Sequence, residues 1–572
     1  MSFLHKILSA AMLLVASLST AAVYPPFESR AGTQTFNPGY AFVTTQTRLV
    51  ETAEAIRALG SDVIKLEMSG RVWGISGYDG YLLPTSPSAY PTLAAMAENE
   101  PSFRAVFDMP FRTYVIWAYP RTISNSYYHA YWRDGLTPSE ATTEYNEIRA
   151  LAEYFLTQYA GTGKTFLIGH WEGDWAVRGH YDKNLNPTNT AIEGMIAWLT
   201  ARQNAINDAR AAHPTSNVKV FNYAEVNLVL DWVRGWTQPW QKTVANSVLP
   251  HVVLDLVSYS AYDSANQVVL GGNFPAWHLD CLNYIESVTT FSSAAPYGKK
   301  VFIGEYGASV TGPSPMMTPA QQTTLATVEL KAAAGWGCPF VLYWQMYDNA
   351  NAGFWLIDNN NTKVGAWHQH NQFLGKAHTL KNLYRFWMER NPTWAEMNAF
   401  SSAWDTYTVS AQLDAILNSP GYAALKTNAQ YLSFLFLHIL GNANPSDPDY
   451  LAYLSQLNGG TPRATVLNSI LNSVRFKNQT SDHDFAVMLF TGTLRRSSID
   501  TNSTEFLNVM STLSGGTPRA TVWRSFLDSA EFRDAELGML TDDTVGSSNV
   551  FAKYFFTFSP PAGVGPEAFL HH

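Results

Sequence analysis

One pattern repeats from about residue 39 to residue 390: a short apolar run, a polar loop and then a longer segment with helical spacing. Such runs are almost continuously hydrophobic, which is typical of parallel strands that are covered on both faces. Eight strands that alternate with helices favour a closed (β/α)8 barrel, the TIM barrel of the α/β class, and an open doubly wound sheet is the alternative. The runs lie at residues 39–45, 62–69, 112–119, 165–172, 218–226, 252–260, 300–307 and 339–347.

Two of the longer segments begin with clear helix signals. Thr137 is an expected N-cap, Pro138 suits the first helical position, and Glu140 completes a capping box. Thr318 and Pro319 repeat this start further along the chain. We therefore expect helices at residues 46–59 and 137–159 and another that begins after residue 318.

The pattern ends at about residue 392 and an internal repeat follows. Residues 454–478 and 510–534 are similar at a period of 56 residues, and residues 416–422 are a fainter echo. Each full copy has Gly-Gly-Thr-Pro-Arg before helically spaced apolar residues, which is a turn followed by a helix start. We expect a small all-α C-terminal domain. The predicted domains are residues 1–22 as signal peptide, 23–395 as barrel and 396–572 as helical repeats.

The N-terminus has the layout of a cleaved export signal. Lys6 precedes an apolar stretch at residues 7–18, and small residues follow before Pro25. An uncleaved N-terminal anchor is the alternative. No other segment approaches the roughly 18 consecutive apolar residues of a membrane span. We expect a protein without a membrane span that is secreted, periplasmic or at the cell surface.

The composition of the chain limits the kinds of binding partner that we expect. Aromatic residues make up 14% of the chain, which is more than a core requires and indicates rings that line a cleft. The formal net charge is −9 and no run of Lys or Arg occurs, so we expect no nucleic-acid partner. Cys281 and Cys338 can form neither a disulfide framework nor a cysteine metal site. A pair of buried thiols is favoured over a disulfide between them.

Two glutamates lie at the positions where the active site of a barrel is expected. Side chains at the carboxyl ends of the strands converge on one open mouth. Glu172 ends the fourth apolar run and Glu305 lies near the end of the seventh. Burial of a carboxylate without a partner is costly, so their positions indicate a function. Two carboxyl groups about 5 Å apart suit glycoside cleavage with retention of configuration.

These positions, with "FIGEYG" around Glu305 and the aromatic run "VLYWQMY", resemble the retaining (β/α)8 glycoside hydrolases called clan A. The resemblance covers residues 39–390. It implies that Glu172 is the acid/base, that Glu305 is the nucleophile, and that no cofactor or metal is needed. It also implies that Tyr259 or Tyr262 lies near the nucleophile and that Trp344 forms the floor under the attacked sugar.

The chain departs from this family at two positions. The Asn that usually precedes the acid/base is replaced by Trp171, and His170 comes before it. A contact with the sugar 2-hydroxyl is then expected from His170 or Asp174, or is absent. The Arg that is usual on the second strand has no match, and Lys65 is expected to supply a point charge in its place.

The expected substrate is a polysaccharide or oligosaccharide. Trp117, Trp171, Trp175 and Trp344 are expected to pack against sugar faces. Glu225 is expected either to contact substrate and tune a pKa or to have a structural role. The acidic chain disfavours sulfated or uronic substrates, although a few local Arg or Lys would be enough to reverse this expectation.

The C-terminal copies resemble a bacterial repeat family of unknown function, found at the ends of exported and surface proteins. The match covers "NGGTPRATV" and "LNSVRF" and implies attachment to a surface or matrix.

Two other functional classes remain open for the barrel. His170, Glu172 and Asp174 alternate as metal ligands on a strand would, and a barrel can also serve as a non-catalytic carbohydrate-binding or surface protein.

Overall fold

The computed structural model describes residues 30–69, 80–85, 89–120, 130–238, 241–312, 316–350 and 352–537. The predicted signal peptide, residues 1–22, lies outside this part of the chain. None of the helices in these ranges combines the length and the apolar character that a membrane span needs. The described residues form two compact units. One unit holds residues 30–378 and Thr393–Tyr407, and the other holds Thr379–Pro392 and residues 408–537.

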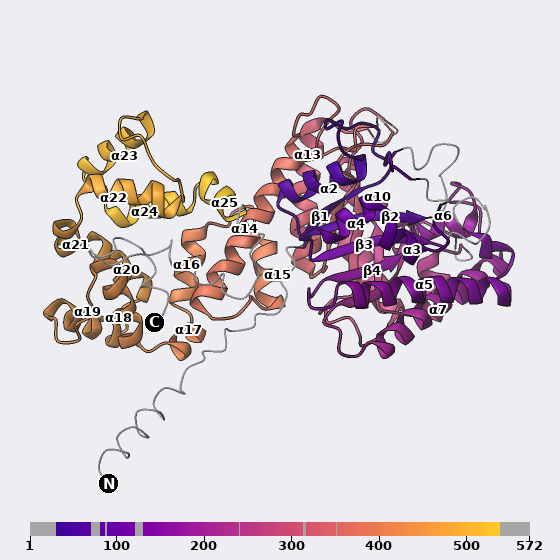
Figure 1. Ribbon diagram of the computed structural model, residues 1–572, viewed down its shortest axis with the longest axis horizontal. Helices are drawn as coiled ribbons and strands as arrows, with labels where there is room; N and C mark the ends of the chain where they lie inside the picture. The colour runs from indigo at the N-terminus through magenta and orange to yellow at the C-terminus, as the bar shows by residue number, and fades with distance from the viewer. Residues whose placement is uncertain are drawn as a thin grey trace, which may run out of the picture. The chain divides into compact units, whose positions relative to one another are not determined.

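The first unit is a closed barrel of eight parallel strands, as predicted. Around the barrel the strands follow the order β1, β2, β3, β4, β5, β7, β9, β10 and back to β1. Figure 1 labels the first four strands of this order, β1, β2, β3 and β4. Their bounds are β1 Ala31–Thr35, β2 Val63–Ser69, β3 Thr113–Tyr119, β4 Thr165–Gly169, β5 Lys219–Val226, β7 Leu256–Ser260, β9 Val301–Tyr306 and β10 Val341–Tyr343. A separate small sheet pairs β6 (Val253–Leu254) with β8 (Thr290–Phe291).

The prediction of the first strand was wrong. Residues 39–45 form a loop, and the strand is Ala31–Thr35. The loop is apolar because Tyr40 packs on other aromatic rings, and its backbone N–H groups at Phe42 and Val43 donate to the carboxylate of Glu51 at 2.7 and 3.0 Å. Strand β1 was missed because its sequence, AGTQT, is not hydrophobic. A Cβ added at Gly32 would lie 2.9 Å from Val63 O, so this strand has no room for a large side chain there.

Helices alternate with the strands and begin where the capping signals predicted. Helix α5 (Pro138–Gln158) has the capping box of Thr137 and Glu140, and α13 (Pro319–Glu329) has the same device at Thr318 and Gln321. The others of this unit are α2 Arg48–Leu59, α3 Leu93–Asn99, α4 Pro101–Asp108, η3 Tyr131–Asp134, α6 Gly173–Arg178, α7 Asn189–Ala212, α8 Leu230–Val233, α9 Val244–Ser247, η4 Leu249–His251, α10 Tyr262–Ala265, α11 Gln267–Leu270, α12 Ala276–Val288, η5 Leu330–Ala334 and α15 Trp394–Ser402. Helix α14 (Gly365–Trp387) crosses the boundary between the two units.

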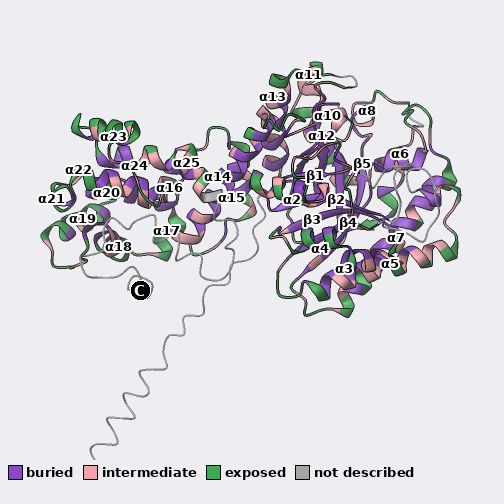
Figure 2. Ribbon diagram, turned by 45° about the horizontal axis from the view of Figure 1, so that its top comes forward, coloured by how far each residue is buried: buried purple, intermediate pink, exposed green. Residues whose placement is uncertain are grey.

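An apolar layer fills the lower interior of the barrel. The strands are buried along their length, whereas the outer faces of the helices are exposed (Figure 2). Polar side chains that face the interior therefore gather above this layer, at the carboxyl ends of the strands. The layer consists of Val63, Val115, Leu167, Phe221, Tyr223, Leu256, Phe302, Phe340 and Leu342.

The second unit is helical and repeats, as predicted. Each copy begins at a Gly-Gly-Thr-Pro-Arg motif or its equivalent position. The first copy holds α16 Val409–Leu417, α17 Pro420–Leu425, α18 Asn428–Leu440 and α19 Pro448–Asn458; the second holds α20 Arg463–Asn472, α21 Val474–Gln479, α22 Asp482–Met488 with η6 Leu489–Thr493, and α23 Thr504–Ser514; α24 Arg519–Leu527 and α25 Ala530–Leu537 begin a third.

The arginine of each motif has the same structural role. Arg463 lies 5.0 and 5.2 Å from the ring centres of Tyr422 and Tyr431, and it donates to the carbonyl of Lys426 at 2.6 Å. Arg519 lies at 5.2 and 5.1 Å from two phenylalanine rings in the second copy. Each guanidinium therefore joins three helices by cation–π packing and a charge-assisted hydrogen bond.

Three helices at equivalent positions, α16, α20 and α24, cap one another. In each contact, the side-chain oxygen of an Asn or Asp at the C-terminal end of one helix accepts a backbone N–H from the first turn of another of the three helices. The pairs are Ala464 with Asn418 at 3.2 Å, Ala520 with Asn472 at 3.0 Å, and Ser410 with Asp528 at 2.9 Å. Because the third copy caps the first, the three helices α16, α20 and α24 close into a ring.

Candidate active site

Strands β2, β5, β7 and β9 bring one lysine and two glutamates into contact inside the barrel. Lys65 Nζ donates to Glu225 Oε2 at 2.9 Å, to the carbonyl of Gly304 at 3.1 Å and to Glu305 Oε1 at 3.3 Å. Ser258 Oγ donates to Glu225 Oε2 at 2.7 Å. The three charged side chains are at most 3% exposed, so one buried cation is shared by two buried carboxylates.

Glu305 reaches this cluster because strand β9 is irregular. Gly304 already faces the barrel interior, so strict alternation would turn Glu305 outward. The pairing with β7 shifts at this point: Ile303 pairs with Tyr259, but Glu305 pairs with the next residue, Ser260. The extra residue in β9 is a bulge, and a bulge can turn the following side chain toward a site.

Gly304 also lets β9 approach its neighbours closely. A Cβ at this position would lie 1.8 Å from Ser258 Oγ and 2.8 Å from Glu225 Oε2. Either oxygen would have to move, and both belong to the hydrogen-bond network that holds Glu225. The cluster therefore depends on a glycine here.

Glu305 has two hydrogen-bond donors and an upward-shifted pKa. Tyr262 donates its hydroxyl to Oε2 at 3.1 Å, and Lys65 donates to Oε1. Burial raises the pKa of Glu305 to about 8; Lys65 opposes this shift, and the negative charge of Glu225 adds to it. Both donors favour the ionised form of Glu305.

Glu172 lies three residues beyond the end of β4, at the N-cap position of α6, and not on the strand itself. Its backbone N–H donates to Glu225 Oε1 at 3.0 Å, which ties this turn to the cluster. Its side chain is 8% exposed, and no donor within the described ranges contacts its carboxyl group. Burial, followed by the charges of Glu305 and Glu225, raises the pKa of Glu172 well above its usual value. The protonated form is therefore favoured.

Glu225 organises the site and is fully buried. Although burial opposes its ionisation, the charge and hydrogen bond of Lys65 and the hydroxyl of Ser258 lower the pKa of Glu225 below its usual value. Its two oxygens bind the backbone of Glu172 and the ammonium of Lys65. It therefore fixes the position of both other glutamates, through the backbone of one and the counter-ion of the other.

Aromatic rings stand beside this cluster. The Lys65 ammonium lies 4.2 Å from the ring centre of Trp117. Trp344, half-buried beyond the end of β10, lies 6.0 Å from Trp117, and Phe36 lies 5.5 and 5.6 Å from the two. Trp117 and Trp344 were predicted, whereas Phe36 was not, because it follows a strand that the sequence does not reveal.

A second set of aromatic rings comes from residues on both sides of Glu172 in the sequence. Trp171 and Trp175 are half-buried, and their rings lie 6.4 and 5.6 Å from that of Tyr181, which is 58% exposed. The backbone N–H of Trp171 donates to the hydroxyl of Tyr119 at 2.7 Å, at the end of β3. These rings offer a partly exposed apolar surface next to the acidic group.

His170 and Asp174 are engaged with the protein. His170 Nε2 accepts the N–H of Glu225 at 3.2 Å, so the neutral ring has its proton on Nδ1, which lies 2.9 Å from the carbonyl of Trp171. Burial lowers the pKa of His170 to about 4, consistent with this neutral form. Asp174 accepts three backbone N–H groups and the guanidinium of Arg178. Because both side chains are buried and bound in this way, we do not propose either residue as a contact for the sugar 2-hydroxyl.

The two candidate tyrosines, Tyr259 in β7 and Tyr262 at the start of α10, have different hydrogen-bond partners. Tyr262 donates to Glu305, but the hydroxyl of Tyr259 binds Asp263 and, at 2.9 Å, Ser264. Tyr259 therefore has a structural place beneath α10. Cys281 and Cys338 are both buried, free thiols. Across the described ranges, no group of three His, Cys, Asp or Glu side chains could hold a metal ion.

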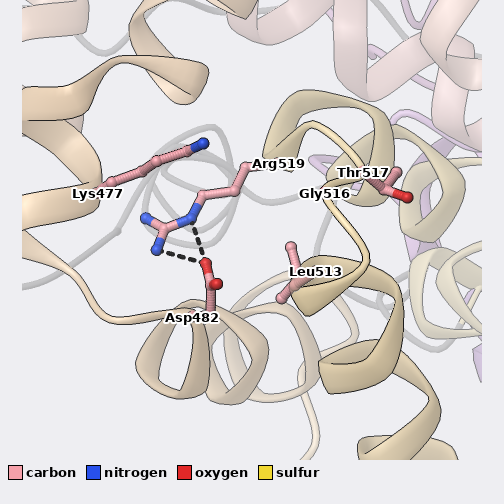
Figure 3. Close-up of a pocket in the computed structure, with 6 residues that line it drawn as sticks. All are labelled: Lys477, Asp482, Leu513, Gly516, Thr517 and Arg519. Atoms are coloured by element: carbon pink, nitrogen blue, oxygen red, sulfur yellow. Dashed lines mark hydrogen bonds and ion pairs between the residues drawn. The ribbon is translucent and has the colours of Figure 1, made fainter.

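The helical unit has a small hollow of its own, about 200 Å³, at the second Gly-Gly-Thr-Pro-Arg motif. Figure 3 shows the guanidinium of Arg519 bound to Asp482 on one side, with the side chain of Lys477 alongside. Arg463, at the other Gly-Gly-Thr-Pro-Arg motif, packs on two tyrosines in the same way, so this hollow is explained by the helix packing.

No protein-family model matches the sequence, and neither does any curated protein. Solved structures do match the barrel. A family 39 glycoside hydrolase from Bacteroides cellulosilyticus WH2 is 13% identical over 62% of this chain and 64% of its own, with a TM-score of 0.36. A GH5_18 protein from Streptomyces cattleya, in complex with GlcNAc, is 14% identical over 63% and 81%, with a TM-score of 0.40.

A Bacteroidetes-affiliated GH5 cellulase is 14% identical over 66% of this chain and 95% of its own, with a TM-score of 0.36. The chain spans less than two thirds of some of these proteins, for example 34% of a β-glucuronidase from Bacteroides uniformis. What this chain has in common with them is a barrel of strands and helices.

Proposed function

We propose that this protein is an exported glycoside hydrolase that cleaves O-glycosidic bonds of a polysaccharide or oligosaccharide by a retaining double displacement. The observation that supports this most is that three buried glutamates in one site differ in their contacts with a cation. Lys65 binds Glu225 and Glu305, whereas no cation contacts Glu172 within the described residues. Two carboxyl groups in different environments, one with a cation and a hydroxyl donor and the other with neither, are suited to opposite roles.

In the first step Glu305 attacks the anomeric carbon. Lys65 and Tyr262 hold its two oxygens and favour the ionised nucleophile. Glu172 gives its proton to the glycosidic oxygen as the bond to the leaving group breaks. Burial and the charges of Glu305 and Glu225 raise its pKa, which favours the protonated form that a general acid needs.

In the second step Glu172, now ionised, takes a proton from water as the water attacks the glycosyl–Glu305 ester. The sugar leaves with its original anomeric configuration, and both glutamates return to their starting states. Glu225 takes no part in proton transfer. It is a positioning residue that holds Lys65 and the backbone of Glu172.

The aromatic groups support a sugar substrate. Trp117 and Trp344 are placed to line the position of the attacked sugar, and Trp171, Trp175 and Tyr181 continue beyond Glu172. Pyranose faces present C–H groups that pack well on such rings. The helical repeats are proposed to attach the protein to a surface or matrix.

The first test is hydrolysis of a panel of plant, algal and microbial polysaccharides by the native protein and by Glu172→Ala and Glu305→Ala variants. Glu153→Gln, on the outer face of α5, is the matched control. We expect the control to keep activity and both site variants to lose at least about a hundredfold. Azide should restore bond cleavage in Glu305→Ala and give a glycosyl azide of inverted configuration.

Other outcomes would identify the alternatives. Activity that survives Glu305→Ala but disappears with a chelator would indicate a metal-dependent hydrolase. Binding of a polysaccharide without cleavage by the native protein would support a non-catalytic carbohydrate-binding protein. Inversion of the anomeric configuration by the native protein would refute the double displacement but keep the activity class.

A further inference from the structure

A second pocket, of about 430 Å³, lies at the far end of α6 from Glu172. Its wall comes from η3, from the end of α6 and from the start of α7. Its lining includes the charged residues Arg133, Arg178 and Asp134, together with His180 and Tyr131, whose hydroxyl donates to Glu144. Its volume lies in the range of pockets that bind small molecules.

Arg133 is the cation in this pocket that the protein leaves unpaired. Arg178 binds the carboxylate of Asp174 at 3.0 Å, but the guanidinium of Arg133 makes no hydrogen bond or ion pair with any described residue. Its Nε is buried, and the acidic lining residue Asp134 is exposed and does not pair with it. A half-buried guanidinium with unused donors can bind an acceptor on a ligand that enters the pocket.

The backbone at Gly179 packs against this guanidinium. A Cβ there would lie 1.3 Å from Arg133 Nη1, and the φ angle of Gly179 is +77°, which favours glycine. The next residue supplies a second donor: His180 Nδ1 accepts the N–H of Asp182 at 3.2 Å, so the neutral ring has its proton on Nε2.

Helix α6 connects this pocket with the turn that holds Glu172. Helix α6 has six residues, so it is about 9 Å long. Along it lie Trp175 and, just beyond its end, the exposed ring of Tyr181. Glu305 comes from β9, three strands around the barrel from β4, and in the proposed mechanism the attacked sugar lies between the two glutamates. The side of Glu172 that faces away from Glu305 therefore faces the leaving group.

We propose that this pocket binds an anionic group, a carboxylate or a sulfate ester, on the leaving-group part of the substrate. Arg133 binds two oxygens of this group through its planar fork, and His180 donates to it from the side. The substrate is then an acidic glycan, contrary to what the net charge of the chain indicated. This inference rests on the proposed function, because it assigns the pocket to the same substrate.

A binding experiment tests the pocket apart from cleavage. In the Glu305→Gln background, oligogalacturonate, oligoglucuronate and oligomannuronate are titrated beside their carboxyl-reduced forms, and a sulfated galactan oligosaccharide beside its desulfated form. We expect one anionic member to bind at least about tenfold more tightly than its neutral partner. The carboxylate and sulfate arms identify the anion.

Three variants of this background then decide the role of Arg133. Arg133→Met should reduce the preference to about one, and Arg133→Lys should keep part of it, because it keeps the charge but loses the fork. Arg149→Met removes an equal charge from the outer face of α5 and should leave the preference unchanged. An undiminished preference in Arg133→Met, or no anion preference in any arm, would overturn the proposal. If Glu305→Gln itself cleaves the oligosaccharides, the proposed mechanism fails, but the preference and its loss still decide the pocket.

Discussion

Replacement of Lys65 by Met should change both the chemistry and the stability of the site. The side chain is 1% exposed and touches Glu225 at 2.9 Å and Glu305 at 3.3 Å. Met has a similar length and no charge, so it fills the space without serving either carboxylate. Two buried carboxylates then lose their counter-ion, and the pKa of each should rise.

The geometry gives the size of the effect. At 3.3 Å and an effective dielectric constant of about 20, the attraction between Lys65 and Glu305 is about 5 kcal/mol. One pKa unit corresponds to about 1.4 kcal/mol, so even a quarter of this attraction moves the pKa of Glu305 by about one unit. The acid limb of kcat/KM, which follows ionisation of Glu305, should move to higher pH by at least this amount. Stability should fall by about 3–5 kcal/mol, because a buried ion pair loses one partner.

The assay is kcat/KM against pH for the wild type, Lys65→Met and Lys65→Arg, together with urea unfolding of each. Lys65→Arg keeps the charge and should leave the limb near its original position. The double variant Lys65→Met with Glu225→Gln should recover much of the stability but not the activity. An acid limb within about 0.3 pH unit of the wild type in Lys65→Met would refute the role assigned to this lysine.

Four further predictions concern single groups. Tyr262→Phe should lower kcat/KM about tenfold and raise the acid limb, because it removes a donor to ionised Glu305, whereas Tyr259→Phe should leave both unchanged. Gly304→Ala should cost about 1–3 kcal/mol in urea unfolding, because its Cβ overlaps Ser258 Oγ, and an unchanged midpoint would contradict the close packing. The pKa of Glu305 is about 8 in the folded chain against an ordinary value of 4.5, so the folded state binds the proton more tightly and loses stability as pH rises between these values. Glu305→Gln should therefore gain stability over the wild type from about pH 5 to about pH 8, and equal slopes in thermal melts would oppose this. Asp528→Ala should cost about 1 kcal/mol, because it removes the acceptor for the N–H of Ser410 in the first turn of α16, the contact that closes the ring of repeats.

Most of the barrel could be predicted from hydrophobicity alone. Seven of the eight apolar runs coincide with strands, because strands buried on both faces require continuous apolar sequence. The exception is β1, where Gly32 has no space for a side chain and Thr33 donates to a backbone carbonyl at 2.8 Å. Its burial comes from neighbouring strands, and nothing in AGTQT itself indicates it.

The site could be predicted by position but not by orientation. Glu305 was expected near the end of its strand, yet strict alternation would turn it outward, and the bulge that turns it inward has no sequence signal besides Gly304. Tyr259 and Tyr262 are three residues apart, and their roles depend on where β7 ends and α10 begins. The network of Glu225 joins four strands and a turn, so no local pattern contains it.

The net charge of the chain and the pocket beyond α6 give opposite expectations for the charge of the substrate. The chain has a formal charge of −9, but the field that a bound anion meets depends on the few groups within about a Debye length of 8–10 Å. In the pocket beyond α6 the protein neutralises Arg178 with Asp174 and leaves Arg133 unpaired among the described residues. A single unpaired guanidinium on a rigid backbone can therefore select an acidic sugar on an acidic protein, and the surrounding negative charge would repel anions that cannot reach it. Raised salt should weaken both effects, so the preference of the wild type for an anionic oligosaccharide should decrease between 0.05 and 0.5 M NaCl, while that of Arg133→Met should stay near one.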